Sequence, residues 1–164
     1  MRFLGKMLSV PMPQNIRKLP KDDRGLPVPA SVAYDSEGKP DFRVIDMEMW
    51  PRLVLGQRCG ICGRKMVDRF AFVGGPKSLE SRYFTDAPMH HECASYALMV
   101  CPFLAAPRFM YAARLPQPIG LEVRTISDNV TRPDYFGLGI TDRYALVDPS
   151  QAILQAGKWI NRIV

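Results

Sequence analysis

Two short motifs with metal-ligating side chains constrain the fold of this chain most strongly. The first, C-G-I-C, runs from Cys59 to Cys62, and the glycines beside each sulfur allow a tight turn that points backbone N–H groups at thiolates. The second, H-H-E-C, runs from His90 to Cys93. Pro88 and the alanine- and leucine-rich run after it predict a helix that begins at about residue 89 or 90. His90 and Cys93 are three residues apart and therefore share a face of that helix.

Two neighbouring residues compete with these four as ligands. His91 stands two positions before Cys93, a spacing that puts the two side chains on different faces, so His91 is the weaker alternative to His90. Cys101 follows Cys93 by eight residues, or ~12 Å along a helix, which zinc–sulfur bonds of ~2.3 Å cannot span. Cys101 is expected to be a small buried apolar residue. The predicted ligands are therefore Cys59, Cys62, His90 and Cys93.

The composition of this ligand set predicts the metal and the fold class. Three thiolates and one imidazole favour a tetrahedral zinc ion with no coordination position left for water, which is a structural site. The order of knuckle, strand pair and helix is that of a treble-clef zinc finger. We therefore expect an α+β fold, a small mixed domain built on a treble-clef-like zinc centre.

Several metal-dependent and histidine-dependent activities do not fit these motifs. Zinc deaminases place H-x-E before P-C-x-x-C, whereas the order here is reversed. The metalloprotease motif H-E-x-x-H fails because Ser95 occupies the position of the second histidine. A nuclease or a serine or cysteine hydrolase would have His91 alone as its general base. The balance favours a binding protein over an enzyme.

A hydrolase or nuclease whose site lies away from the zinc is an alternative. Paired acids beside basic residues can bind a metal ion and phosphate, although acidic pairs in a loop are usually solvated. The residues that would form such a site are Asp22, Asp23, Arg24, Asp41 and Arg43.

The chain divides by composition into three parts of one structural unit. Residues 1 to 50 are proline-rich and predict an extended arm that packs on the core, with a strand in "DFRVIDMEMW". Residues 51 to 107 form the predicted zinc core, in which "RKMVDRFAFVGGP" predicts two short strands. Residues 108 to 164 predict the strands "LEVRTIS" and "RYALVD" and a C-terminal amphipathic helix.

The evidence for that last helix is a start signal followed by a helical period. Asp148-Pro149-Ser150-Gln151 offers an N-cap, a proline at the first helical position and a glutamine after it. Apolar residues then recur at helical spacing. They are Ile153, Ala156, Ile160 and Ile163.

The positive charge of the chain is concentrated around the first motif. Residues 52 to 82 contain seven basic and two acidic residues, and so account for five of the six net positive charges. Such a region suits an anionic partner, most commonly nucleic acid, and a solvated surface is the alternative. The side chains expected to contact nucleic acid are Arg58, Arg64, Lys65 and Arg69. Without a secretory signal or an apolar stretch that could cross a bilayer, we expect reduced thiols and a cytoplasmic location.

Five segments together resemble a set of uncharacterised proteins of bacteria and their phages. They are RGLPVPASV, PDFRVID, CGICG, AFVGGP and PMHHECASYALMVCPFL, within residues 17 to 107. The resemblance supports His90 over His91, because the shared histidine stands three positions before the cysteine. It implies that the N-terminal arm belongs to the same unit as the zinc core, and it implies no activity. A phage origin would suit a small basic protein that binds nucleic acid or modulates a host protein.

Overall fold

The computed structural model describes residues 2 to 101, residue 104 and residues 133 to 164. Its helices are α1 (Arg2–Leu8), α2 (Met49–Leu55), α3 (Pro76–Ser81) and α4 (His91–Val100). Its strands are β1 (Val32–Tyr34), β2 (Pro40–Ile45), β3 (Phe70–Gly74), β4 (Tyr83–Phe84), β5 (Gly137–Thr141), β6 (Tyr144–Asp148), β7 (Ile153–Ala156) and β8 (Asn161–Ile163). The mixed α and β architecture expected from the sequence is confirmed.

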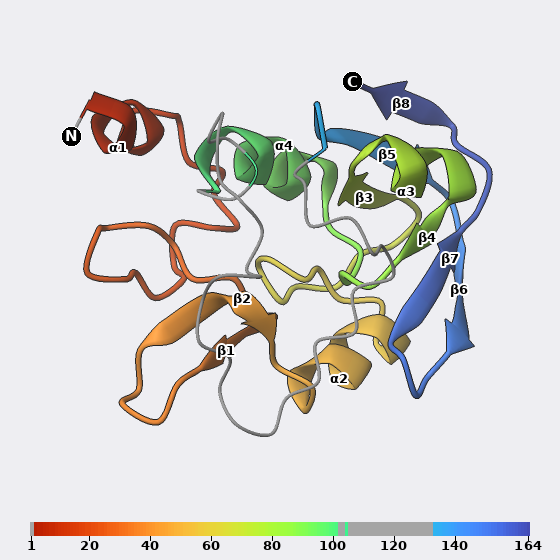
Figure 1. Cartoon of the computed structure of the whole chain (residues 1–164), viewed down its shortest axis with the longest axis horizontal. Coiled ribbons are helices and arrows are strands. Elements are labelled where there is room, and N and C mark those ends of the chain that lie inside the picture. The colour runs from red at the N-terminus through yellow and green to blue at the C-terminus, as the bar shows by residue number, and fades with distance from the viewer. Residues whose placement is uncertain (1, 102–103, 105–132) are drawn as a thin grey trace.

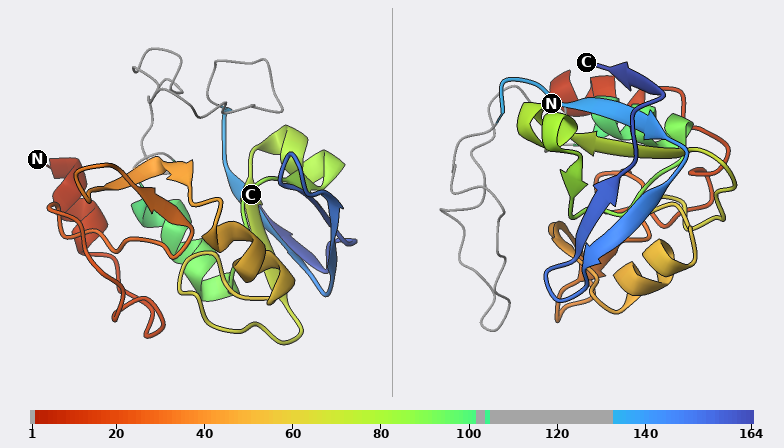
Figure 2. Two further views of the ribbon diagram at one scale, coloured as in Figure 1. Left: turned by 90° about the horizontal axis from the view of Figure 1, so that it is seen from below. Right: turned by 90° about the vertical axis from the view of Figure 1, so that its right-hand side faces the viewer.

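The strands form three small antiparallel sheets. β1 and β2 form a hairpin of their own, β3-β5-β8 form one three-stranded sheet, and β4-β7-β6 form another. Helix α4 packs against β3 and β5 on one side and meets α1 on the other. Figures 1 and 2 show α4 between the N-terminal segments and the two three-stranded sheets. Helix α4 is therefore the element around which the chain is arranged.

The N-terminal arm contributes to the same core as the sheets. Ile16, Leu26 and Val28 are at most 3% exposed, as buried as the core phenylalanines of β3. Burial of such side chains contributes roughly 1.5–3 kcal/mol each, which holds a segment that has little regular structure. The regular elements of this arm are the helix α1, which precedes the first proline, and the β1-β2 hairpin.

The predicted C-terminal helix is wrong, because the segment contains β7 (Ile153–Ala156) and β8 (Asn161–Ile163) instead. The start signal is real: the Asp148 carboxylate accepts hydrogen bonds from the N–H groups of Ser150 and Gln151. The chain then reverses at Ala152, whose φ is 54°, and returns as β7 beside β6. In β7 the buried residues alternate, with Leu154 and Ala156 inside. The alternation that suits the central strand of the β4-β7-β6 sheet happens to coincide with a helical period over these residues.

Other strand predictions have mixed outcomes. The strand within "DFRVIDMEMW" is confirmed as β2, although the last residues of that segment begin α2. "RYALVD" is confirmed as β6. "RKMVDRFAFVGGP" contains one strand, β3, and not two, because its first part pairs with the chain before the cysteine motif only through the isolated bridge of Arg58 with Lys65. "LEVRTIS" lies outside the described residues.

A glycine in β5 leaves room for an aromatic side chain to pack on the β3-β5-β8 sheet. A Cβ atom on Gly139 would lie 2.5 Å from Cε3 of Trp159, so no larger residue fits there without displacing the indole. The Trp159 indole N–H donates a 2.8 Å hydrogen bond to the carbonyl of Leu79 in α3, and its ring packs edge-on against Phe84. The indole is therefore held on three sides.

We predict that Gly139→Ala lowers the free energy of unfolding by about 1–3 kcal/mol, the usual cost of overpacking a filled core. The measurement is urea denaturation, in which the dependence of the unfolding free energy on urea concentration should be the same for all variants. Gly5→Ala is the matched control, because a Cβ there meets nothing within 4 Å, and it should leave stability unchanged or raise it by up to ~1 kcal/mol. Equal stability of the two variants would contradict the packing argument.

Candidate metal centre

The first motif sits at the closed end of a short antiparallel ladder. Met66 N–H bonds the carbonyl of Gln57, and Cys59 N–H bonds the carbonyl of Arg64, both at 2.8 Å. The chain between them turns through Gly63, whose φ is +72°, a conformation that favours glycine. We call residues 57 to 59 paired with residues 64 to 66 the knuckle ladder. It holds Cys59 and Cys62 at a fixed position on the surface of the core.

The second motif begins α4. His90 is the N-cap residue and Cys93 lies in the first turn, which brings both side chains to the same end of the helix. The knuckle is joined directly to this end, because Gly60 N–H bonds the carbonyl of Pro88 at 2.8 Å. A Cβ atom on Gly60 would lie 3.1 Å from that of Ala87, so glycine permits this close approach.

The four predicted ligands converge. One ligand atom from each of Cys59, Cys62, His90 and Cys93 lies within 4.8 Å of all the others, and this group could hold a metal ion. We call these four residues the metal group. Ligands of a tetrahedral zinc ion stand about 3.5–3.8 Å from one another, given bonds of ~2.0–2.3 Å. The observed Nδ1 to Sγ separation of His90 and Cys62 is 3.3 Å, so the donor set fits a small tetrahedral ion.

A backbone carbonyl selects the nitrogen of His90 that faces the sulfurs. His90 Nε2 lies 3.2 Å from the carbonyl oxygen of Lys65 in the knuckle ladder. A carbonyl only accepts, so Nε2 carries the proton and Nδ1 presents its lone pair to the metal group. This outer hydrogen bond is the kind that orients metal-bound imidazoles in proteins. The ladder thus positions a ligand that belongs to the helix.

The three sulfurs are held close enough to change one another's acidity. Hydrogen bonds from the thiols of Cys59 and Cys93 lower the pKa of Cys62, and the hydrogen bonds of Cys93 to Cys59 and Cys62 raise the pKa of Cys93. The charges of neighbouring thiolates also raise the pKa of Cys93, so the three sulfurs repel one another when more than one is ionised. A divalent cation between them would replace this repulsion by attraction and would favour all three thiolates. Backbone N–H groups of Cys62 and His90 already point at Cys59 Sγ, at 3.5 and 3.3 Å.

The two residues that competed as ligands are not part of the metal group. His91 is exposed on α4. Cys101 ends α4 and is half-buried. Among the described residues, no other cluster of histidine, cysteine and carboxylate side chains has this geometry.

The predicted nucleic-acid residues are all exposed, but they do not share one face. Arg58 and Lys65 are opposite one another in the knuckle ladder. Arg64 points away from them, because its guanidinium bonds Asn15 Oδ1 at 2.9 Å. Arg69 bonds the carbonyl of Asp68. The structure therefore brings Arg58 and Lys65 together and separates Arg64 from them.

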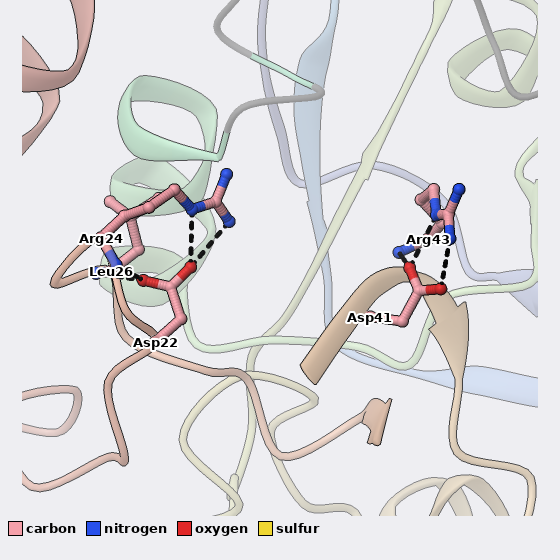
Figure 3. Close-up of polar contacts among 5 residues, drawn as sticks. All are labelled: Asp22, Arg24, Leu26, Asp41 and Arg43. Carbon is pink, nitrogen blue, oxygen red and sulfur yellow. Dashed lines mark hydrogen bonds and ion pairs between the residues drawn. The ribbon is translucent and has the colours of Figure 1, made fainter. Parts of the chain in front are cut away.

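The acidic and basic residues of the alternative hydrolase site form two local ion pairs (Figure 3). Asp22 pairs with Arg24 at 2.7 Å and accepts the N–H of Leu26 at 2.9 Å. Asp41 pairs with Arg43 through both carboxylate oxygens, at 2.8 and 2.6 Å. The side-chain hydrogen bond from Arg43 lowers the pKa of Asp41. These contacts stabilise the turn after Asp22 and the strand β2, and Asp23 is exposed beside the turn. The side chains therefore give no support to a hydrolytic site.

An asparagine of the N-terminal arm, which no sequence motif singles out, links the two halves of the site. Asn15 accepts a hydrogen bond from Arg64 and donates one to Glu92 Oε1 at 3.1 Å. Arg64 follows the knuckle and Glu92 lies between the two ligands of α4. The arm also bonds the knuckle directly, through Ala30 N–H to Ile61 and Ser31 N–H to Gly60, at 2.8 and 3.0 Å.

Comparison with known proteins adds no assignment. The chain matches no protein-family model, no curated protein and no solved structure. The resemblance to bacterial and phage proteins therefore stays a prediction. None of the helices that the structure describes has both the length and the apolar character needed to cross a lipid bilayer.

We predict that His90→Ala and Cys93→Ser lose the metal, because each removes a ligand atom from the metal group. His91→Ala and Cys101→Ala are the matched controls. The first removes a histidine one position after His90, and the second removes a cysteine eight positions after Cys93. Both variants should retain the metal. Elemental analysis of purified protein, expressed as metal per chain, is the measurement. Loss of metal from Cys101→Ala with retention in His90→Ala would reverse the ligand assignment.

Proposed function

We propose that the metal group binds a structural zinc ion and that the chain is a binding protein. Four protein ligands complete a tetrahedral shell, which leaves no position for a catalytic water or a substrate. Cys59 and Cys93 are completely buried, so the ion would be part of the core. The arrangement of a knuckle, strands and the first turn of a helix supports a treble-clef-like centre. It differs from the predicted order in one respect, since β3 pairs with β5, which follows α4 in the chain.

Removal of the ion should unfold the core and not merely silence binding. The knuckle ladder and α4 meet at the metal group, and metal affinity at such sites is largely folding free energy. We predict that a strong chelator at neutral pH abolishes the cooperative thermal transition, and that added zinc restores it. The measurement is near-ultraviolet circular dichroism, which reports the packing of Trp50 and Trp159. An unchanged transition after verified metal loss would show that the fold does not depend on the ion.

The surface that we propose for binding is the outer face of the knuckle ladder. Arg58 and Lys65 are a non-hydrogen-bonded pair, because the ladder bonds run between the residues on either side of them. Side chains of such pairs lie closer than those of hydrogen-bonded pairs, and like charges in this position are destabilising. The placement of two basic residues opposite one another, each bonded through its charged group to a backbone carbonyl and not to a carboxylate, is the observation that carries the proposal of an anionic partner.

The charges of this pair are not neutralised by the part of the chain that the structure describes. Arg58 bonds the carbonyl of Gly63 at 3.2 Å, and Lys65 bonds the carbonyl of Gly56 at 2.8 Å. The ion pairs among the described residues involve other side chains. An anionic macromolecule would supply the missing counter-charge. Nucleic acid is the partner class that the sequence predicted, and a protein partner is the other.

We predict that the double substitution Arg58→Ala, Lys65→Ala weakens binding of duplex DNA and flattens its salt dependence, if nucleic acid is the partner. Each neutralised phosphate contributes about −0.9 to the log–log slope of affinity against salt. The measurement is fluorescence anisotropy at several salt concentrations.

Lys39→Ala is the matched control, because Lys39 is exposed in the β1-β2 turn and paired with Glu37 at 3.6 Å. It should change neither affinity nor slope, and neither variant should lose zinc. DNA binding that is equally strong in the double variant would remove the ladder from the binding surface, and no DNA binding would favour the protein partner.

A further inference from the structure

The three cysteines of the metal group differ in their exposure to solvent. Cys59 and Cys93 are completely buried, with 0% of each residue exposed, whereas Cys62 is partly exposed. The fourth cysteine of the chain, Cys101, lies outside the metal group. Reactive cysteines in proteins are partly exposed, and buried structural ones are inert. Cys62 is therefore the cysteine ligand at which a dissolved reagent can reach the metal group.

The surroundings of Cys62 favour an anionic sulfur. Arg58 Nη1 donates a 3.2 Å hydrogen bond to the carbonyl of Gly63, the residue after Cys62, so a guanidinium lies at this turn. A nearby cation and partial exposure are two properties that distinguish oxidisable thiolates from structural cysteines. Coordination to a divalent ion also keeps a thiol ionised. The turn thus presents a thiolate to solvent.

A second sulfur is placed to react with an oxidised Cys62. The Cys62 N–H points at Cys59 Sγ at 3.5 Å, and the turn between them is closed by the 2.8 Å hydrogen bond from Gly63 N–H to the Cys59 carbonyl. The two sulfurs lie within 4.8 Å of one another, so side-chain rotation within one turn can bring them to the ~2.05 Å of a disulfide. Cys93 belongs to α4, and a bond to it would also have to accommodate the position of that helix.

We infer that Cys62 is an oxidation site at which hydrogen peroxide dismantles the metal group. This inference rests on the proposed function, because it takes the four ligands to be zinc-bound. The Cys62 thiolate attacks one oxygen of the peroxide, the O–O bond breaks, and the hydroxide that leaves takes up a proton to become water. The sulfur has then lost two electrons to the peroxide and is a sulfenic acid.

Cys59 completes the reaction without a further oxidant. Its thiolate attacks the Cys62 sulfur, an S–S bond forms, the S–O bond breaks, and the departing hydroxide is protonated to water. His90 and Cys93 are then the two ligands that remain, where a tetrahedral zinc site uses four. The ion therefore leaves, still divalent.

Oxidation of Cys62 would reach the proposed binding surface. The knuckle ladder and α4 meet at the metal group, and the Lys65 carbonyl of the ladder lies 3.2 Å from His90 Nε2 of that group. Loss of the ion removes the coordination that joins these elements. A thiol reductant cleaves the disulfide, so the change is reversible if the sulfenic acid has not been oxidised further. The metal group would thus act as a switch that couples an oxidant to partner binding.

The test treats the zinc-loaded full chain with hydrogen peroxide, as wild type and as Cys101→Ala. A chromogenic chelator follows zinc release, and dimedone, which reacts with sulfenic acids, labels the sulfur that is oxidised first. Trypsin cleaves after Arg58, Arg64 and Arg82, so Cys59 and Cys62 fall in one peptide and Cys93 in another. Fragmentation mass spectra then assign each modification to a residue.

We expect the dimedone label on Cys62. Without dimedone, we expect loss of all bound zinc and a disulfide between Cys59 and Cys62 that leaves their peptide lighter by two hydrogen atoms, with Cys93 still open to alkylation. Dithiothreitol and zinc should then restore the near-ultraviolet circular dichroism of the folded chain. Cys101→Ala is the matched control and should respond as wild type does, because it removes the thiol outside the metal group.

Three outcomes would overturn the inference and leave the proposed zinc site in place. They are a dimedone label that appears on Cys59 or Cys93 before Cys62, a disulfide that joins the two peptides, and zinc that is retained in excess peroxide. Zinc release that is abolished in Cys101→Ala would have the same meaning. A purified chain without bound metal would overturn both this inference and the proposed function.

Discussion

The convergence of three sulfur atoms and one imidazole nitrogen within 4.8 Å is the constraint on which the rest of the structure depends. Two of the four side chains come from a turn between ladder strands and two from the start of α4, so neither element can move without separating them. Helix α4 in turn packs on β3 and β5. The small sheets of this chain are each too short to be stable alone, and their common attachment to one helix compensates for that.

The hydrogen bond from His90 Nε2 to the Lys65 carbonyl makes the binding surface part of this arrangement. The carbonyl of Lys65 faces the ligand, and its side chain belongs to the outer face of the ladder. Metal coordination and partner binding would therefore use opposite sides of the same residue. The ladder hydrogen bonds on either side of Arg58 and Lys65, together with the knuckle, hold the strands that carry these two like charges.

Local spacing predicted the site well and the outer parts of the fold less well. The positions of Cys59, Cys62, His90 and Cys93 could be read from the sequence because coordination imposes short, fixed separations. The C-terminal helix was wrong because Ile153, Ala156 and Ile160 fit a helical period, while pairing with β6 and β4, which no local pattern reveals, decided the outcome. The link that Asn15 makes between Arg64 and Glu92 could not be predicted from the sequence, because it depends on the path of the N-terminal arm.

The hydrogen bonds of Ala30 and Ser31 to the knuckle have a consequence for the portability of this centre. Zinc fingers are often treated as modules that can be excised and grafted. A peptide that spans residues 56 to 101 would contain all four ligands of the metal group, yet it would lack the arm residues that satisfy the carbonyls of Gly60 and Ile61. It would also lack β5, which pairs with the full length of β3. This metal centre is therefore a joint between distant parts of one chain, and its smallest transferable unit is close to the whole described fold.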